Sequence, residues 1–406
     1  MIEALRREKE MRFLHSADLH IDRSFEGVHL LSEKVKTQLP AINQKIIRNL
    51  VDVALEKAVD FVLLAGDTFH QARPSLKVQH DFFAQLQRLG EAQIPVYMIF
   101  GNHDYYDPQR YWFAFPENVI LFSSEEVQTV QGTTKNGETY AISGFSYQHP
   151  WITENKVTEF PARAAVDYHI GLYHGDQAGE RYAPFSISEM KQKGYDYWGL
   201  GHIHVPKTLS EQPPILYPGT PQGKTKKEQA TGVILADLTP QGPTIERLEI
   251  AEIAWQKQVV SLADVTASNA VLPAIIERLK SPRSRLLHLV LTDVQQLPPD
   301  WFPAAEKNEW LTYLNERLAQ TEPLQVIYAL EVEQANEDKI ALAVSEDYML
   351  QFLAMYESPE MFADRLSDLL QHPLIQRGIT HESFQEEVLQ QAKQLLKDDF
   401  QWEEQS

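Results

Sequence analysis

The chain has 406 residues, 43% of them hydrophobic and 23% charged, which predicts a globular protein of two or three domains and excludes a disordered one. It contains no cysteine, so disulfide bonds, thiolate metal sites and a cysteine nucleophile are excluded, and no apolar run approaches the ~20 residues that a membrane helix needs. The net charge of -20 argues against a nucleic-acid binder of the usual basic kind acting alone.

The first ten residues are charged and helix-prone, and they lack the apolar segment of a secretory signal. We interpret 1–10 as an N-terminal extension, because Met11 directly precedes the first expected strand. With no cysteine and no signal, a cytoplasmic protein without a membrane partner is the expectation.

Residues 11–254 alternate short apolar runs with segments of helical spacing, which predicts an α/β domain. Polar clusters follow the apolar runs, at the carboxyl ends of strands, where α/β sheets place their active sites. The expected strands are Arg12–Ser16, Asp60–Ala65, Val96–Phe100, Tyr140–Ser143, His169–Tyr173, Tyr197–Leu200 and Val233–Ala236, and the expected helices are Leu39–Ala58 and Val78–Leu89. The later strands suggest a second sheet packed against the first.

Residues 255–335 form a second predicted unit, a small α/β domain. Its expected strands are Val259–Leu262, Leu286–Leu291 and Leu324–Val332, and its expected helices are Ala270–Leu279 and Pro303–Leu318.

Residues 336–406 are expected to be helical. Ser358-Pro359 and the pair Ser383 and Glu386 are typical of helix starts. The following apolar residues repeat at helical spacing on one face, which either packs on its own domain or docks a partner: Phe384, Val388, Ala392, Leu395, Leu396 and Phe400.

Five clusters bring together carboxylate, imidazole and amide groups, and they hold six of the 14 histidines. They are Asp18-Leu-His20, Gly66-Asp67-Thr-Phe-His70, Gly101-Asn102-His103-Asp104, His174-Gly175 and Gly201-His202-Ile-His204. Carboxylate oxygens mixed with imidazole nitrogens suit Mn, Fe or Zn better than Mg or Ca. Each cluster alone is a weak signal, but all five in this order, each near a strand end, predict a two-metal phosphoesterase.

A pair of metal ions needs a bridging ligand, and Asp67 is the best candidate because it follows a central strand. Asp18, His20 and His204 then complete one site, and Asn102, His174 and His202 complete the other. His103 lies outside these ligands and is expected to stabilise charge or to protonate the leaving oxygen, with Asp104 orienting it. His169 competes with His174 but lies inside a strand, so we interpret it as structural.

The series D-x-H, GD, GNHD, H and GHxH resembles the calcineurin-like metallophosphoesterase superfamily over about residues 11–250. The segment GDTFHQARPS, which has His70 where many relatives carry a second aspartate, resembles the SbcD nuclease branch of that superfamily. Tyr217-Pro218-Gly219-Thr220 resembles that branch's YPGS segment, and the chain as a whole resembles YhaO-type bacterial DNA repair exonucleases.

This resemblance implies a four-layer αββα sandwich, two Mn ions and a role for His70 at the active site. It also implies that the domain after residue 255 is a capping domain that positions DNA, and that the protein works with an SbcC-like coiled-coil ATPase. A homodimer is a further expectation.

Three functions stay open at this point. The first is a Mn-dependent DNA exonuclease or endonuclease of the SbcD type, acting in DNA repair. The second is a phosphodiesterase or phosphatase on nucleotides or another small substrate, and the third is a non-catalytic subunit with a vestigial site. The charge favours the second, because residues 1–250 hold 25 Lys+Arg against 31 Asp+Glu, whereas residues 251–406 hold 12 against 26. The GDTFH segment and the extra domain favour the first.

Overall fold

The computed structural model describes residues 10–28, 33–177, 179–295, 297 and 307–333, together with residues 358, 388 and 389. The chain divides into two compact units, Met1–Glu333 and Gln334–Ser406, and every element named below belongs to the first. The expected helix starts at Ser358-Pro359 and Ser383, and the apolar face from Phe384 to Phe400, therefore fall outside the described residues except at Ser358, Val388 and Leu389. Among the described residues, no helix is both long and apolar enough to cross a membrane.

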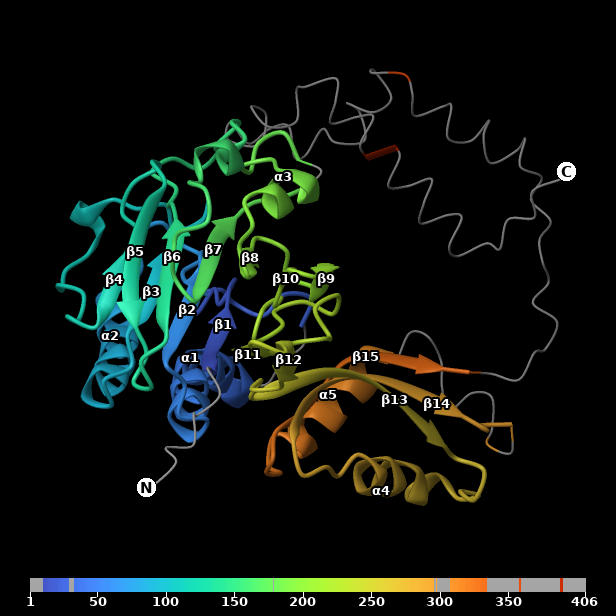
Figure 1. Cartoon of the computed structure of the whole chain (residues 1–406). Coiled ribbons are helices and arrows are strands. Elements are labelled where there is room, and N and C mark those ends of the chain that lie inside the picture. The colour runs from blue at the N-terminus through green and yellow to red at the C-terminus, as the bar shows by residue number, and fades with distance from the viewer. Residues whose placement is uncertain are drawn as a thin grey trace, which may run out of the picture. The chain divides into compact units, whose positions relative to one another are not determined.

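The first large sheet has the strand order β12-β11-β1-β2-β3-β4 (Figure 1). Strands β1 to β4 run parallel, while β11 and β12 are antiparallel additions at one edge. Their bounds are β1 Met11–Ser16, β2 Phe61–Ala65, β3 Val96–Ile99, β4 Val119–Leu121, β11 Val233–Thr239 and β12 Gly242–Leu248. Because successive side chains of a strand point to opposite faces, Phe13 and Leu14 enter different core layers.

Helices α1 (Glu33–Glu56) and α2 (Leu76–Glu91) cover one face of this sheet. Helix α2 begins after Ser75, whose side chain accepts a hydrogen bond from the backbone N–H of Val78 at 3.3 Å. Helix α1 begins six residues before the expected Leu39, with Pro40 inside it. The sequence suggested a later start because proline is normally tolerated only in a helix's first turn. Buried contacts of Val35 and Leu39 stabilise the additional turns.

The second large sheet has the order β5-β6-β7-β8-β10-β9. Its strands are β5 Gln128–Thr133, β6 Thr139–Gly144, β7 Tyr168–His174, β8 Tyr197–Gly201, β9 Lys207–Glu211 and β10 Pro214–Tyr217. It packs on the first sheet through a shared apolar layer that includes Phe61, Ile170 and Tyr197. Its other face is covered by residues of the 3-10 helix η2 (Lys156–Glu159) and the short helix α3 (Ile187–Gln192). The four-layer α/β/β/α fold is therefore confirmed.

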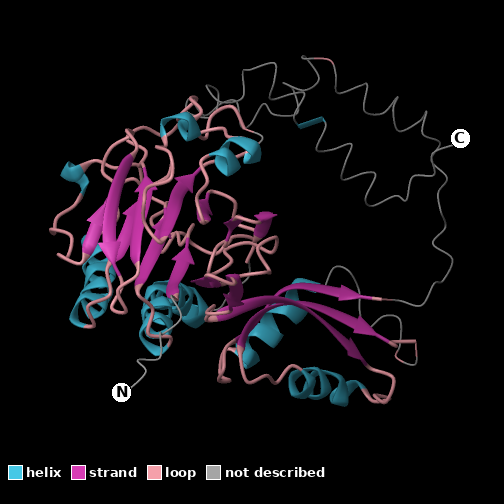
Figure 2. Cartoon of the chain, in the orientation of Figure 1, coloured by secondary structure: helices cyan, strands magenta, loops and turns pink. Residues whose placement is uncertain are grey.

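The remaining three strands, β13 (Ile253–Ser261), β14 (Ser284–Thr292) and β15 (Gln325–Val332), form a parallel sheet (Figure 2). Helices α4 (Ser268–Arg278) and α5 (Lys307–Leu318) bury their apolar residues on one face of it. The other face packs against the N-terminal part of α1. Strand β13 begins six residues before the expected Val259, and residues 303–306 of the last expected helix lie outside the described part of the chain.

Candidate metal centre

The carboxyl ends of five strands, or the loops that follow them, position the expected site residues. Asp18 and His20 follow β1, Asp67 follows β2, and Asn102 and His103 follow β3. From the second sheet, His174 is the last residue of β7, and His202 and His204 follow β8. The centre therefore lies at the seam of the two sheets, with four expected ligands from the first and three from the second.

The carboxylate of Asp67 lies between two groups of side chains that offer potential metal-ligand atoms. Its Oδ2 atom is 3.7 Å from Nε2 of His20 and 3.6 Å from Nε2 of His174. On the first side, Nε2 of His20 is 3.1 Å from Nε2 of His204, and Asp18 belongs to the same potential metal-binding group. On the other side, Oδ1 of Asn102 is 3.1 Å from Nε2 of His174.

These separations suit ions bound between the side chains. Ligand atoms that each lie ~2.1 Å from one ion, at angles of about 90–120°, are about 3.0–3.6 Å apart. His202 completes the second group, because its Nδ1 atom is 3.2 Å from Oδ1 of Asn102. Asp67 is thus close to potential ligand atoms on both sides, and it also forms a potential metal-binding group with Asp18 and His174.

In two imidazole rings, the hydrogen bond made by Nδ1 determines whether Nε2 carries a proton or a lone pair. Nδ1 of His174 is 2.9 Å from the carbonyl oxygen of Ala65 and must donate to it, because a carbonyl only accepts. In the neutral ring, Nε2 then presents a lone pair to Oδ1 of Asn102. His204 is alike: Nδ1 donates to the carboxylate of Glu228 at 2.7 Å, so that Nε2 presents a lone pair to His20. The Nε2 lone pair of His174 on one side of Asp67 and that of His204 on the other each suit the binding of a separate cation.

The backbone at the site is held in an uncommon conformation. Asp18, His20, Asp67 and His202 have φ angles of 51°, 41°, 50° and 109°, a region that residues other than glycine rarely adopt. The loops brace each other, since the N–H of Asp18 donates to Gly66 O and that of His20 donates to Asp67 O, both at 3.1 Å. Strain of this kind persists where the surroundings fix it, which is typical of functional sites.

Gly101 lets the third loop approach this closely. A Cβ atom built on it would lie 2.2 Å from Oδ1 of Asp67 and 2.7 Å from Nε2 of His174. Any side chain at this position would therefore displace two of the expected ligands.

Burial controls the charges of the site. It raises the pKa of Asp18 to about 6 and raises that of Asp104 well above its usual range, with the nearby charge of Asp67 adding to the effect on Asp104. Burial also lowers the pKa of His202 to about 4 and that of His20 well below its usual range. His20 and His202 are thus neutral and able to act as ligands, and a bound cation would favour the charged carboxylates.

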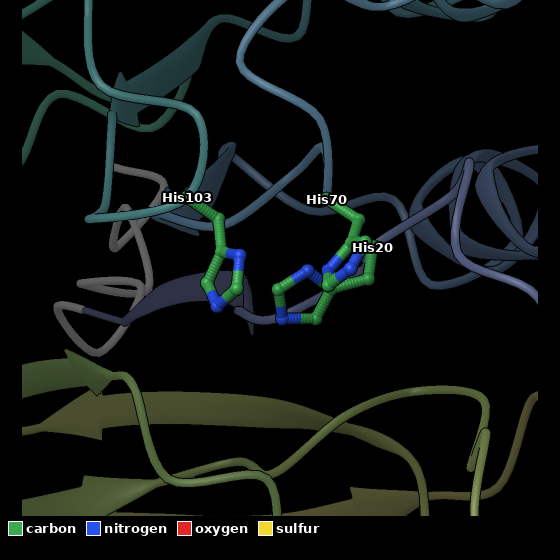
Figure 3. A group of neighbouring side chains, drawn as sticks. All are labelled: His20, His70 and His103. Carbon is green, nitrogen blue, oxygen red and sulfur yellow. The ribbon is translucent and has the colours of Figure 1, made fainter. Parts of the chain in front are cut away.

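Three histidine rings from different loops face a common space (Figure 3). The rings of His70 and His103 are stacked at 4.8 Å, and the ring of His20 is 5.0 Å from that of His103. The backbone N–H of His103 donates to Oδ1 of Asp67 at 3.0 Å, which fixes this loop beside the shared carboxylate. His70 and His103 therefore lie next to the expected ligands.

Asp104 is hydrogen-bonded to backbone groups of two loops. Its carboxylate accepts backbone hydrogen bonds from Thr68 at 2.8 Å, Phe69 at 3.2 Å and Gly101 at 2.8 Å. These hydrogen bonds join the loop after β3, which carries Asp104, to the loop after β2. No hydrogen bond or ion pair between Asp104 and His103 is described. His169, by contrast, is structural as expected, because both ring nitrogens are hydrogen-bonded, to Ser143 and to the N–H of Ala164.

Sequence reasoning missed Glu228. It lies in a lysine-rich segment with no motif, and only its position after Tyr217-Pro218-Gly219-Thr220 could have pointed to it. That segment is itself bonded to the site, because the backbone N–H of Thr220 donates to the carbonyl oxygen of His204 at 2.9 Å. The hydrogen bond to His204 and those from the backbone outweigh burial and lower the pKa of Glu228.

The chain is similar in sequence to several known proteins. The family model for calcineurin-like phosphoesterases matches residues 11–206. The chain is 32% identical to the uncharacterized metallophosphoesterase YhaO of Bacillus subtilis, over 96% of this chain and 97% of that protein. It is 30% identical to the SbcD subunit of the nuclease SbcCD of the same species, over 62% of this chain and 70% of that protein. It is 23% identical to the DNA double-strand break repair protein Mre11 of Sulfurisphaera tokodaii, over 59% and 62%.

Proposed function

The chain belongs to the calcineurin-like phosphoesterase family, and we propose that it is a two-metal phosphodiesterase whose substrate is DNA. The observation that carries the proposal is the set of convergent lone pairs on either side of Asp67. Asp18, His20 and His204 would hold one ion, Asn102, His174 and His202 would hold the other, and Asp67 would contact both. The mixed oxygen and nitrogen donors favour Mn, with Fe, Zn or Mg as other possible occupants.

Bound divalent ions would supply positive charge that stabilises the charge developing on the phosphoryl oxygens. The remaining chemistry belongs to the chain. His103 lies beside Asp67 without being one of the proposed ligands, so it can donate a proton to the leaving oxygen. His70 stacks on His103, and its pKa is lowered by burial and by the charge of His103, which suits a neutral hydrogen-bond donor to the substrate.

Similarity to two proteins named for nuclease or DNA repair functions supports DNA as the substrate. The SbcD protein is named as one subunit of a nuclease, which supports a partner for this chain as well. We propose an SbcC-like coiled-coil ATPase as that partner, a DNA-positioning role for the domain built by β13, β14 and β15, and a cytoplasmic location. A homodimer is the alternative assembly.

A second candidate is a phosphodiesterase or phosphatase on nucleotides or other small substrates. The net charge of -20 favours it, because a phosphate backbone is repelled by an acidic surface. A small ester that fits within the centre avoids most of that repulsion.

The test is a substrate panel with Mn²⁺: single-stranded DNA, duplex DNA, a chromogenic phosphodiester and free nucleotides. We expect degradation of DNA by the wild type and none by Asp67→Ala. His169→Asn serves as the control that alters a buried histidine away from the centre. Turnover of only the small substrates would favour the second candidate, and no turnover at all would favour a vestigial site.

A further inference from the structure

Glu228 contacts one proposed ligand and is held rigidly while doing so. Its Oε1 atom accepts the hydrogen bond from Nδ1 of His204 at 2.7 Å, and its Oε2 atom accepts backbone hydrogen bonds from Lys224 at 2.6 Å and Thr225 at 3.1 Å. Arg23 adds a positive charge 3.6 Å from Oε1. The residue is only 6% exposed, so the carboxylate has little freedom to turn away.

The segment that carries Glu228 also holds the three-stranded domain. We call residues 222–228 the strap. Oε1 of Gln222 accepts hydrogen bonds from the backbone of Glu252 and Ile253, and its amide donates to Ile253 O at 2.8 Å. The indole N–H of Trp255 donates to Gly223 O at 3.0 Å. One end of the strap is thus bonded to the start of β13 and the other to His204.

We propose that Glu228 is a positioning residue for His204, and that the strap thereby links the affinity of one metal ion to the attachment of the three-stranded domain. The carboxylate keeps the proton of His204 on Nδ1, which leaves the lone pair of Nε2 directed at the centre. Carboxylate partners of this kind orient the ring and make the imidazole a stronger ligand, and losing one costs about 10–100-fold in metal affinity. This inference rests on the two-metal centre proposed above.

The prediction is selective, because His204 belongs to only one of the two proposed ligand groups. Replacing Glu228 by Gln removes the negative charge and one of the two side-chain oxygens that accept hydrogen bonds, at nearly constant volume. Titration of the metal-free full chain with Mn²⁺ should show two binding steps for the wild type. In Glu228→Gln, one step should weaken about 10–100-fold while the other stays unchanged. A residue with only a structural role would affect both steps or neither.

Glu26→Gln is the matched control. Glu26 pairs with the same Arg23, at 2.8 Å, but its side chain is 57% exposed and does not contact His204 in the structure. This variant loses the same charge next to the same arginine, so both binding steps should stay at their wild-type values.

Two further variants separate the parts of the inference. In a His204→Ala background, Glu228→Gln should cause no further loss of affinity, because its effect acts through that ring. Gln222→Ala keeps Glu228 but removes the side-chain hydrogen bonds of Gln222 to Glu252 and Ile253, and the step that is weak in Glu228→Gln should weaken here too. Electron paramagnetic resonance should show a coupled Mn pair in the wild type and an isolated Mn signal in Glu228→Gln at the same loading.

The outcomes are distinguishable from failure of the proposed function. A wild type that binds fewer than two ions overturns the two-metal centre, and this inference with it. Two unchanged steps in Glu228→Gln overturn the positioning role alone. Unchanged binding by Gln222→Ala overturns the link to the three-stranded domain, whichever substrate the enzyme cleaves.

Discussion

Replacement of Gly101 by alanine tests whether the shared carboxylate lies where the structure has it. The added Cβ would lie 2.2 Å from Oδ1 of Asp67, and ordinary contact begins at 3.4 Å, so the carboxylate must move by about 1.2 Å. Metal–ligand distances tolerate only about 0.2 Å, and misplacement by ~1 Å costs about 10²-fold in rate. We expect Gly101→Ala to bind Mn²⁺ poorly at both steps of a calorimetric titration and to lose about 10²-fold in kcat/KM. The free energy of unfolding should fall by about 1–3 kcal/mol from overpacking.

Gly137→Ala is the control for this prediction. Its φ of +100° disfavours alanine, but a Cβ there meets nothing within 4 Å. It should lower stability through backbone strain and leave both metal-binding steps intact. Two wild-type binding steps in Gly101→Ala would refute the placement of Asp67 between the two ligand groups.

Four other outcomes are expected. Asp67→Ala should retain neither ion firmly, and elemental analysis that finds a full load of two would refute the shared ligand. His103→Ala should keep both ions in the same assay but lose about 10²–10⁴-fold in turnover, and near-normal rates would exclude it from catalysis. Burial lowers the pKa of His15 to about 3, so below pH 6.5 the unfolded chain takes up a proton that the folded protein does not. The free energy of unfolding, measured by denaturation at a series of pH values, should therefore fall as the pH drops from about 6.5 to about 3. This fall with pH should be smaller in His15→Gln. Duplex binding by the isolated chain should be weak with a shallow salt dependence, which an ATPase partner should steepen by ~0.9 per added phosphate contact. Tight, steeply salt-dependent binding by the chain alone would reveal a basic groove.

The sequence was sufficient for the part of the fold that depends on apolar runs. The three central strands of the first sheet are continuous buried segments, so their ends, and the polar clusters after them, could be located. Strand β4 has only three residues, and most of β5 is exposed, so neither carries an apolar pattern that predicts a strand. Val35 lies in the part of α1 before the expected start, and it packs against residues of β13 and β14, a tertiary contact that no local pattern contains.

The candidate site divides along the same line. Residue types in sequence order predicted which side chains would meet, because the carboxyl ends of parallel strands share an edge. They did not predict partners brought together by loop geometry. The sequence paired Asp104 with its neighbour His103, and it did not predict that the carboxylate also accepts hydrogen bonds from Thr68 and Phe69 in the loop after β2. Glu228 was overlooked because its 24-residue separation from His204 carries no periodic signal.

The proposed ligands come from two different sheets, so the apolar layer between the sheets also sets the distance between the two groups. Asp18, Asp67 and their neighbours belong to one sheet, whereas His174 and the pair after β8 belong to the other. Side chains such as Ile170 fill the space between the sheets, so they act as spacers that set how far apart the two half-sites stand. A methylene added or removed in this layer changes sheet separation as well as stability. Substitutions in this layer are therefore expected to change the spacing between the two proposed ion positions without any change in the proposed ligands themselves.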